Sequence, residues 1–181
     1  MVNYEKKHLF IMSAIGLLIL MPLFLLTGPF IFQGILFDDP SVWLIQTPTQ
    51  SYWLYAISIF LLALSLFLSY FYTKFSIFIT ILGIILAGVF FTMGTFTFKS
   101  LSTEEITWGE PLAFKTHVYS WEDVKEVILV SPPNKEEKHT MVFYFKDGNE
   151  VTFIRNIAFQ TEFSNFNTAR RQYNFPFTAS E

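Results

Sequence analysis

Few residues of this 181-residue chain could take part in catalysis or metal binding. The three histidines, His8, His117 and His139, do not form an HExxH motif or another pair at the spacing of metal ligands. The chain contains no cysteine, which excludes disulfide bonds, thiolate catalysis and cysteine-ligated zinc. It also lacks a glycine-rich phosphate loop and the Gly-x-Ser-x-Gly motif. The sequence therefore predicts no catalytic, cofactor-binding or metal-binding residues, and it favours a protein that is not an enzyme.

Three pairs of adjacent acidic residues are the remaining candidates, besides Glu136-Glu137 in the exposed loop expected over 132–138. Glu104-Glu105 is expected where the chain leaves the membrane, and Glu122-Asp123 in a helical turn that Ser120 caps. Asp38-Asp39 could bind a cation at the membrane surface, but a loop boundary ahead of Pro40 is the simpler interpretation. Since catalysis needs a nucleophile or base held beside such groups, we expect all three pairs to be structural.

The charged residues are distributed very unevenly along the chain. Residues 9–98 contain three charged side chains, Asp38, Asp39 and Lys74, whereas residues 99–181 contain twenty-one. The charged fraction of the whole chain, 15%, lies below the roughly 25% of soluble domains. This pattern excludes a purely soluble or a disordered protein. Residues 99–181 hold nine Lys or Arg against twelve Asp or Glu, so they lack the basic surface that nucleic-acid binding requires.

Three apolar segments are long enough to cross a hydrocarbon core, which takes about 20 helical residues. They lie at about 9–27, 52–72 and 75–94, and they predict a membrane domain of three transmembrane helices over residues 1–98. A signal peptide is the alternative interpretation of the first segment, but the segment is too long and no small-residue cleavage site follows it. Pro22 is expected to kink the first helix.

The connections between these segments differ in length. Residues 28–51 are expected to form the first loop, and the apolar stretch from Phe30 to Phe37 would lie along the membrane interface. Trp43, Tyr52 and Trp53 suggest an aromatic belt ahead of the second span. Thr73-Lys74 predicts a tight turn before the third.

Small residues on the second and third spans recur at helical spacing. Counting outward from the turn places Ser65 opposite Gly83 and Ser58 near Ala87, which predicts an antiparallel hairpin with a closely packed seam. Random scatter of small residues is the alternative. No Asp, Glu, Lys, Arg or His lies inside a span, which argues against a transporter that acts alone. The full seam comprises Ser58, Ser65 and Ser69 on one helix and Gly83, Ala87 and Gly94 on the other.

From Lys99 onward, the hydrophobic pattern becomes that of strands followed by a helix. Strands are expected at 106–108, 112–119, 124–130, 141–145 and 151–155, with an exposed loop over 132–138 and a hairpin turn at Asp147-Gly148. Phe159, Phe163 and Phe166 then recur at helical spacing, which predicts a helix packed on the sheet. A membrane-surface helix is the alternative, with only Arg170 and Arg171 as cations on its polar face.

The segments Glu105-Ile106-Thr107-Trp108 and Val118-Tyr119-Ser120-Trp121-Glu122-Asp123-Val124 resemble the bacterial pleckstrin-homology-like (PH-like) domains, in which a strand ends in an aromatic-Ser-Trp-acid pattern. The resemblance covers roughly residues 95–173, including the hairpin Phe143–Gly148 and the final helix. It implies that residues 99–181 form a water-exposed, mostly-β domain, a small barrel of two bent antiparallel sheets capped by the C-terminal helix. Bacterial membrane proteins often pair such a domain with a few spans. Early loops show no cluster of Lys and Arg, so binding of lipid headgroups is not implied.

These observations predict a multi-pass cell-membrane protein whose exposed domain is a non-enzymatic interaction module for a protein partner or the membrane surface. Besides the lipid bilayer, the expected partner is another protein or a second copy bound through spans two and three. An accessory subunit of a transporter or channel is the alternative, and a membrane-embedded enzyme is a third. Lys6, Lys7 and Lys74 on one side, against Lys99 and Lys115 on the other, place the N-terminus in the cytoplasm and the C-terminal domain outside. The PH-like resemblance favours the opposite orientation.

Overall fold

The computed structural model describes residues 6–37, 39–112, 115–132 and 139–180. The chain forms two compact units. The membrane unit comprises Met1–Leu36, Thr47–Thr97 and Pro111–Phe114, and the exposed unit comprises Phe37–Gln46, Phe98–Glu110 and Lys115–Glu181. Asp38 of the pair Asp38-Asp39 lies outside the described residues, and so do residues 133–138 of the expected loop.

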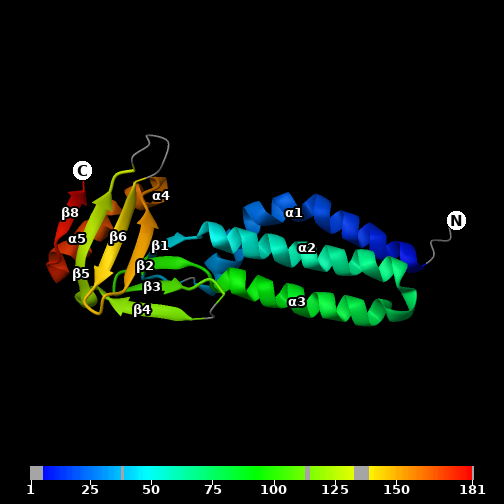
Figure 1. Ribbon diagram of the computed structural model, residues 1–181. Coiled ribbons are helices and arrows are strands. Elements are labelled where there is room, and N and C mark those ends of the chain that lie inside the picture. The colour runs from blue at the N-terminus through cyan, green and yellow to red at the C-terminus, as the bar shows by residue number, and fades with distance from the viewer. Residues whose placement is uncertain (1–5, 38, 113–114, 133–138, 181) are drawn as a thin grey trace. The chain divides into compact units, whose positions relative to one another are not determined.

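The membrane unit consists of three long helices, α1 (Lys6–Leu36), α2 (Thr49–Phe71) and α3 (Ser76–Phe96) (Figure 1). Each is long and apolar enough to cross a membrane, so the three predicted helices are present and are compatible with membrane insertion. A short 3-10 turn, η1 (Thr73–Phe75), joins α2 to α3 where the tight turn was expected.

The predicted end of the first helix near Thr27 is wrong, because α1 continues through Gly28 and Pro29 to Leu36. A membrane helix tolerates an internal proline when its neighbours compensate for the lost hydrogen bond. The apolar stretch after Pro29 therefore extends the helix instead of lying along the interface as a loop. Packing holds this last part in place, since the Phe32 ring lies 4.8 Å from that of Phe91 on α3, edge to face.

The seam of small residues between α2 and α3 is confirmed. The Ser58 hydroxyl donates to the main-chain oxygen of Ala87 at 2.8 Å. A Cβ placed on Gly83 would overlap Cβ and Oγ of Ser65, so only glycine fits at that position. Because the residues at this seam have small side chains, α2 and α3 approach each other closely, as the spacing predicted.

The exposed unit contains two four-stranded sheets (Figure 1). The first has the order β1-β2-β3-β4 and is antiparallel throughout, whereas the second has the order β7-β6-β5-β8, with β8 parallel to β5. The strands are β1 (Val42–Gln46), β2 (Lys99–Ser102), β3 (Glu105–Gly109), β4 (Thr116–Ser120), β5 (Val124–Val130), β6 (Thr140–Phe145), β7 (Glu150–Ile154) and β8 (Phe177–Ser180).

Strand β1 corrects the expectation that residues 28–51 form a plain loop. It pairs with β2, with Gln46 opposite Lys99, so a segment between the first two spans completes a sheet of the exposed unit. Trp43 therefore belongs to this unit and not to an aromatic belt: its ring is stacked 6.3 Å from that of Trp121. Pairing with β2 and burial against the core outweigh the local turn signals around Pro40 and Pro48.

The C-terminal part confirms the predicted hairpin and helical region, with two additions. The hairpin turn between β6 and β7 has Gly148 at a φ of 89°, a conformation that glycine adopts without strain. The helical region is divided at Glu162 into α4 (Ile157–Thr161) and α5 (Phe163–Tyr173). β8 follows α5 and was not expected. The two sheets remain separate ladders in the described part of the chain, so the predicted closed barrel is not formed.

The core of the exposed unit is built around Trp121, which is fully buried. Its ring stacks on Phe175 at 5.8 Å, and its indole N–H donates to the main-chain oxygen of Ser102 at 3.0 Å. Helix α5 packs on the second sheet through Phe166, whose ring lies 6.0 Å from that of Phe143. The helix that was predicted to pack on the sheet does so.

Candidate functional site

Four strands lie at the edges of the two sheets: β1 and β4 in the first, and β7 and β8 in the second. The Gln46 side chain joins β1 to β7, because its Nε2 donates to Ile154 O at 2.6 Å and its Oε1 accepts from Ile154 N–H at 2.9 Å. Lys99 Nζ adds a bond to Thr152 O at 2.5 Å. β1 and β7 are thus linked by side-chain hydrogen bonds although they do not pair as strands, and β4 and β8 form the other two sheet edges among the described residues.

Strand β4 presents an open hydrogen-bonding edge. The N–H of Glu110 donates to Lys115 O at 2.9 Å, next to the β3–β4 ladder. Hydrogen-bonded pairs alternate in an antiparallel ladder, so the N–H and C=O of Val118 point away from β3. The Val118 side chain is 56% exposed. β4 contains no proline, lysine or bulge, the features with which natural proteins protect an edge.

A surface pocket of about 740 Å³ lies beside this strand. Val118 and Ser120 line it together with Thr103, Glu104, Glu105, Gln172 and Tyr173. The predicted acidic pair thus contributes to a pocket, in a turn that Ser102 fixes by accepting hydrogen bonds from the N–H groups of both glutamates. We call β4 and the lining of this pocket the β4 surface, comprising residues 103–105, 116–120, 172 and 173.

The half-buried side chains of His117 and Tyr119 link β4 to its neighbours. The Tyr119 hydroxyl donates to Asp147 Oδ2 at 2.5 Å and accepts from Asn149 Nδ2 at 2.7 Å. The hydrogen bond to Asp147 raises the pKa of Tyr119, and the same bond lowers the pKa of Asp147. The Trp108 ring stacks on His117 at 4.8 Å and on Tyr119 at 5.2 Å. An edge held in this way is preorganised for a partner strand.

The three histidines lie apart and have separate surroundings. His117 Nε2 is 2.5 Å from Glu110 Oε1, at the edge of the ring stack. The His8 ring lies 6.0 Å from that of Tyr70 in the membrane unit, and the main-chain oxygen of His139 accepts from Arg155 N–H at 2.8 Å. Over the described ranges, no group of three His, Asp or Glu side chains is arranged to hold a metal ion.

Asp39, Glu122 and Asp123 contribute to local structure. Ser120 caps the turn η2 (Trp121–Asp123): its hydroxyl accepts from Glu122 N–H at 3.3 Å, while Asp123 Oδ2 accepts from Ser120 N–H at 3.2 Å, as predicted. Asp39 accepts from Ser41 N–H at 2.8 Å, and this bond lowers the pKa of Asp39. Asp123 with Ser120, and Asp39 with Ser41, therefore stabilise turns that lead into strands.

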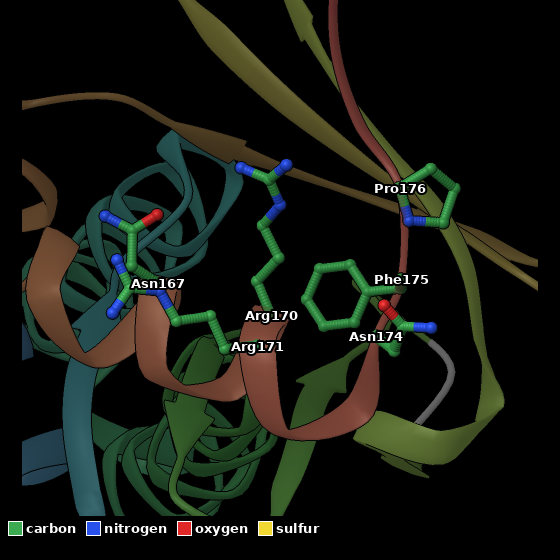
Figure 2. Close-up of a pocket in the computed structure, with 6 residues that line it drawn as sticks. All are labelled: Asn167, Arg170, Arg171, Asn174, Phe175 and Pro176. Carbon is green, nitrogen blue, oxygen red and sulfur yellow. The ribbon is translucent and has the colours of Figure 1, made fainter.

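A second pocket, of about 570 Å³, lies at the end of α5 (Figure 2). We call it the arginine pocket. Figure 2 shows Arg170 extending from the helix past Phe175, and Arg171 turned toward Asn167. The Arg170 guanidinium carbon lies 5.4 Å from the centre of the Phe177 ring, a cation–π distance. The lining consists of Asn167, Arg170, Arg171, Asn174, Phe175 and Pro176.

Sequence reasoning missed three features of these sites. The run Val42-Trp43-Leu44-Ile45 has the composition of a strand and could have indicated β1. The sequence indicated Arg170 and Arg171 as cations on the polar face of a helix, but it did not predict that they line a pocket. The partner of Gln46, which is 108 residues away, leaves no local signal.

Comparison with known proteins does not assign the chain to a family. The chain matches no protein-family model, and no curated protein is similar to it in sequence.

Proposed function

We propose that this protein is a membrane-anchored, non-enzymatic interaction module that binds a protein partner by strand addition along β4. In this mode, an extended segment of the partner pairs with an exposed sheet edge, and its side chains enter neighbouring pockets. The observation that carries the proposal is the open edge at Val118 beside the pocket that Glu104 and Glu105 line. A basic or polar side chain of the partner would complement those two carboxylates.

We also propose that the exposed unit is a PH-like domain. Two sheets formed largely by successive antiparallel strands, followed by a helix, support this assignment. So does the position of Trp121, whose ring contacts Phe143 of β6 and Phe175 just after α5. The unit departs from the expected pattern in taking β1 from the segment between α1 and α2, and in adding β8 after the helix.

The charge distribution supports an orientation with the N-terminus in the cytoplasm and the exposed unit outside. Lys6, Lys7 and Lys74 lie at one end of the predicted spans, whereas Lys99 and Lys115 follow the third. In this orientation, the partner is a component of the cell envelope or an extracellular protein.

Site-specific photocrosslinking in the native membrane tests the proposed function. A photoreactive amino acid at Thr116, an exposed position on β4, is expected to give one discrete protein adduct. Val118→Lys should abolish the adduct, because an edge lysine blocks strand pairing. Thr178→Lys, the matched change on the other free edge, should leave it intact.

Each other outcome has a defined meaning. An adduct that persists in Val118→Lys would refute strand addition along β4. Adducts with lipid alone would favour the membrane surface as the partner. Stoichiometric adducts with a transport protein would favour an accessory subunit.

A further inference from the structure

The arginine pocket has a composition opposite to that of its surroundings. Residues 99–181 carry more acidic than basic side chains, twelve against nine, yet none of the six residues that line this pocket is acidic. Four of the six carry side-chain N–H donors: Arg170, Arg171, Asn167 and Asn174. Within the described residues, neither arginine forms an ion pair with a carboxylate.

The helix dipole explains only part of this charge. Arginines in the last turn of α5 complement the partial negative charge at a helix C-terminus, which is equivalent to about half an elementary charge. Two guanidinium groups carry about two positive charges. The charge of the two guanidinium groups therefore exceeds what the helix terminus alone would balance.

The local backbone keeps the donors in place. Asn174 ends α5 in the left-handed conformation, with a φ of 52°, and turns the chain sharply into Phe175 and β8. Phe175 is buried in the core, so this turn is anchored. The ring of Phe177 lies against the Arg170 guanidinium on one side, which leaves the N–H groups at the edge of that planar group able to bind an anion.

We propose that the arginine pocket binds a small organic polyanion that presents carboxylate or phosphate groups. A volume of about 570 Å³ exceeds the needs of a single inorganic ion and falls in the range of small-molecule sites. The two arginines contact separate anionic groups, because Figure 2 shows their side chains diverging. Asn167 and Asn174 add neutral donors. This site is separate from the β4 surface, and it does not depend on the proposed function.

Titration calorimetry on the full chain in phosphatidylcholine nanodiscs tests the proposal, with citrate and pyrophosphate as soluble probes. Saturable binding of at least one probe is expected. Arg170→Gln combined with Arg171→Gln should weaken the affinity by about tenfold or more, because charge-assisted hydrogen bonds are lost. Lys125→Gln, which removes an exposed cation from β5 outside the pocket, should bind as the native protein does.

A second experiment distinguishes binding of a soluble ligand from binding of a lipid headgroup. Nanodiscs that contain phosphatidylglycerol would raise the melting temperature of the native protein, but not that of the double variant, if the anionic group belongs to a lipid. If the double variant does not fold, Arg171→Gln alone serves as the test, since Arg171 is exposed and makes no ring contact among the described residues. The proposal is overturned if neither probe binds and phosphatidylglycerol has no effect that depends on the arginines, or if the variants bind as tightly as the native protein.

Discussion

The side-chain amide of Gln33 on α1 donates a hydrogen bond to the main-chain oxygen of Thr97, just after α3, at 3.0 Å. The other end of the same amide accepts from the Thr47 hydroxyl at 2.6 Å. Thr47 is the residue at which the chain enters the membrane unit after β1, and Thr97 is the last residue of that unit before β2. One buried glutamine therefore bonds to the chain at two of the points where it passes between the units.

Replacing Gln33 with Leu should destabilise the membrane unit by about 1–3 kcal/mol, because Thr47 and the carbonyls at the end of α3 lose their partner in a buried place. Thermal unfolding in detergent, followed by circular dichroism, measures the change. Thr27→Leu is the control on the same helix, since its hydroxyl donates to Leu23 O on an exposed face. Equal melting temperatures for the two variants would contradict this role of Gln33.

Gly83→Ala should destabilise the α2–α3 hairpin by about 1–3 kcal/mol, since the new methyl group overlaps Ser65 Cβ and forces the helices apart. Gly88→Ala lies on the same helix, where a Cβ would meet nothing within 4 Å. It should be neutral or slightly stabilising, because alanine is the better helix former. The same unfolding measurement compares the two, and a Gly83 variant as stable as the Gly88 variant would exclude a tight seam.

Trp121→Ala should cost about 3–5 kcal/mol of the stability of the exposed unit, as large aromatic truncations in a core do. Because Trp43 of β1 packs against this ring, the measurement requires the full chain and not a fragment that begins after α3. Near-ultraviolet circular dichroism during denaturant unfolding reports the loss. Trp53→Ala, at a position on α2 that is 68% exposed, should leave this transition unchanged.

The bond between Tyr119 and Asp147 should make stability depend on pH at both extremes. Because the pKa of Asp147 is lower in the folded than in the unfolded chain, Asp147 stabilises the fold at pH values above its unfolded pKa of about 4. This contribution is lost as the pH falls through the pKa that Asp147 has in the folded protein. The raised pKa of Tyr119 stabilises the fold below about pH 10, and its contribution is lost as the pH rises through the folded pKa.

Tyr119→Phe should therefore lower the melting temperature at pH 7 and reduce its change toward acid and alkaline pH. Melting curves of the exposed unit across this range, recorded on the full chain, test the expectation. Tyr144→Phe, on β6, is the control and should keep the pH profile of the native protein. An unchanged profile in Tyr119→Phe would show that the bond contributes nothing to stability.

Pairing of β1 with β2 requires that the segment after α1 and the segment after α3 lie on the same side of the membrane. Single cysteines at Pro40 and Thr178 of the cysteine-free chain should therefore react with an impermeant maleimide from one side, and a cysteine at Lys74 from the other. Labelling of intact cells at Pro40 and Thr178 alone would support the outward orientation. Opposite accessibility of Pro40 and Thr178 would contradict the β1–β2 pairing itself.

The sequence by itself determined the features that depend on neighbouring residues or on a regular period. Uncharged runs of about 20 residues specify membrane helices, because the bilayer core cannot hydrate a backbone or a charge. Ser65 and Gly83 could be matched by counting along two helices from a short turn, and the cap at Ser120 and the turn at Gly148 are likewise local.

Tertiary structure alone decided the features that depend on residues far apart in the chain. β1 becomes a strand only because β2, more than fifty residues later, offers it a free edge. Trp43 is buried by Trp121, and Gln46 finds its partner at Ile154. The arginine pocket exists because Asn174 turns the chain back against α5. Such contacts depend on closing long loops of chain, and no local pattern of residues records which distant segments will meet.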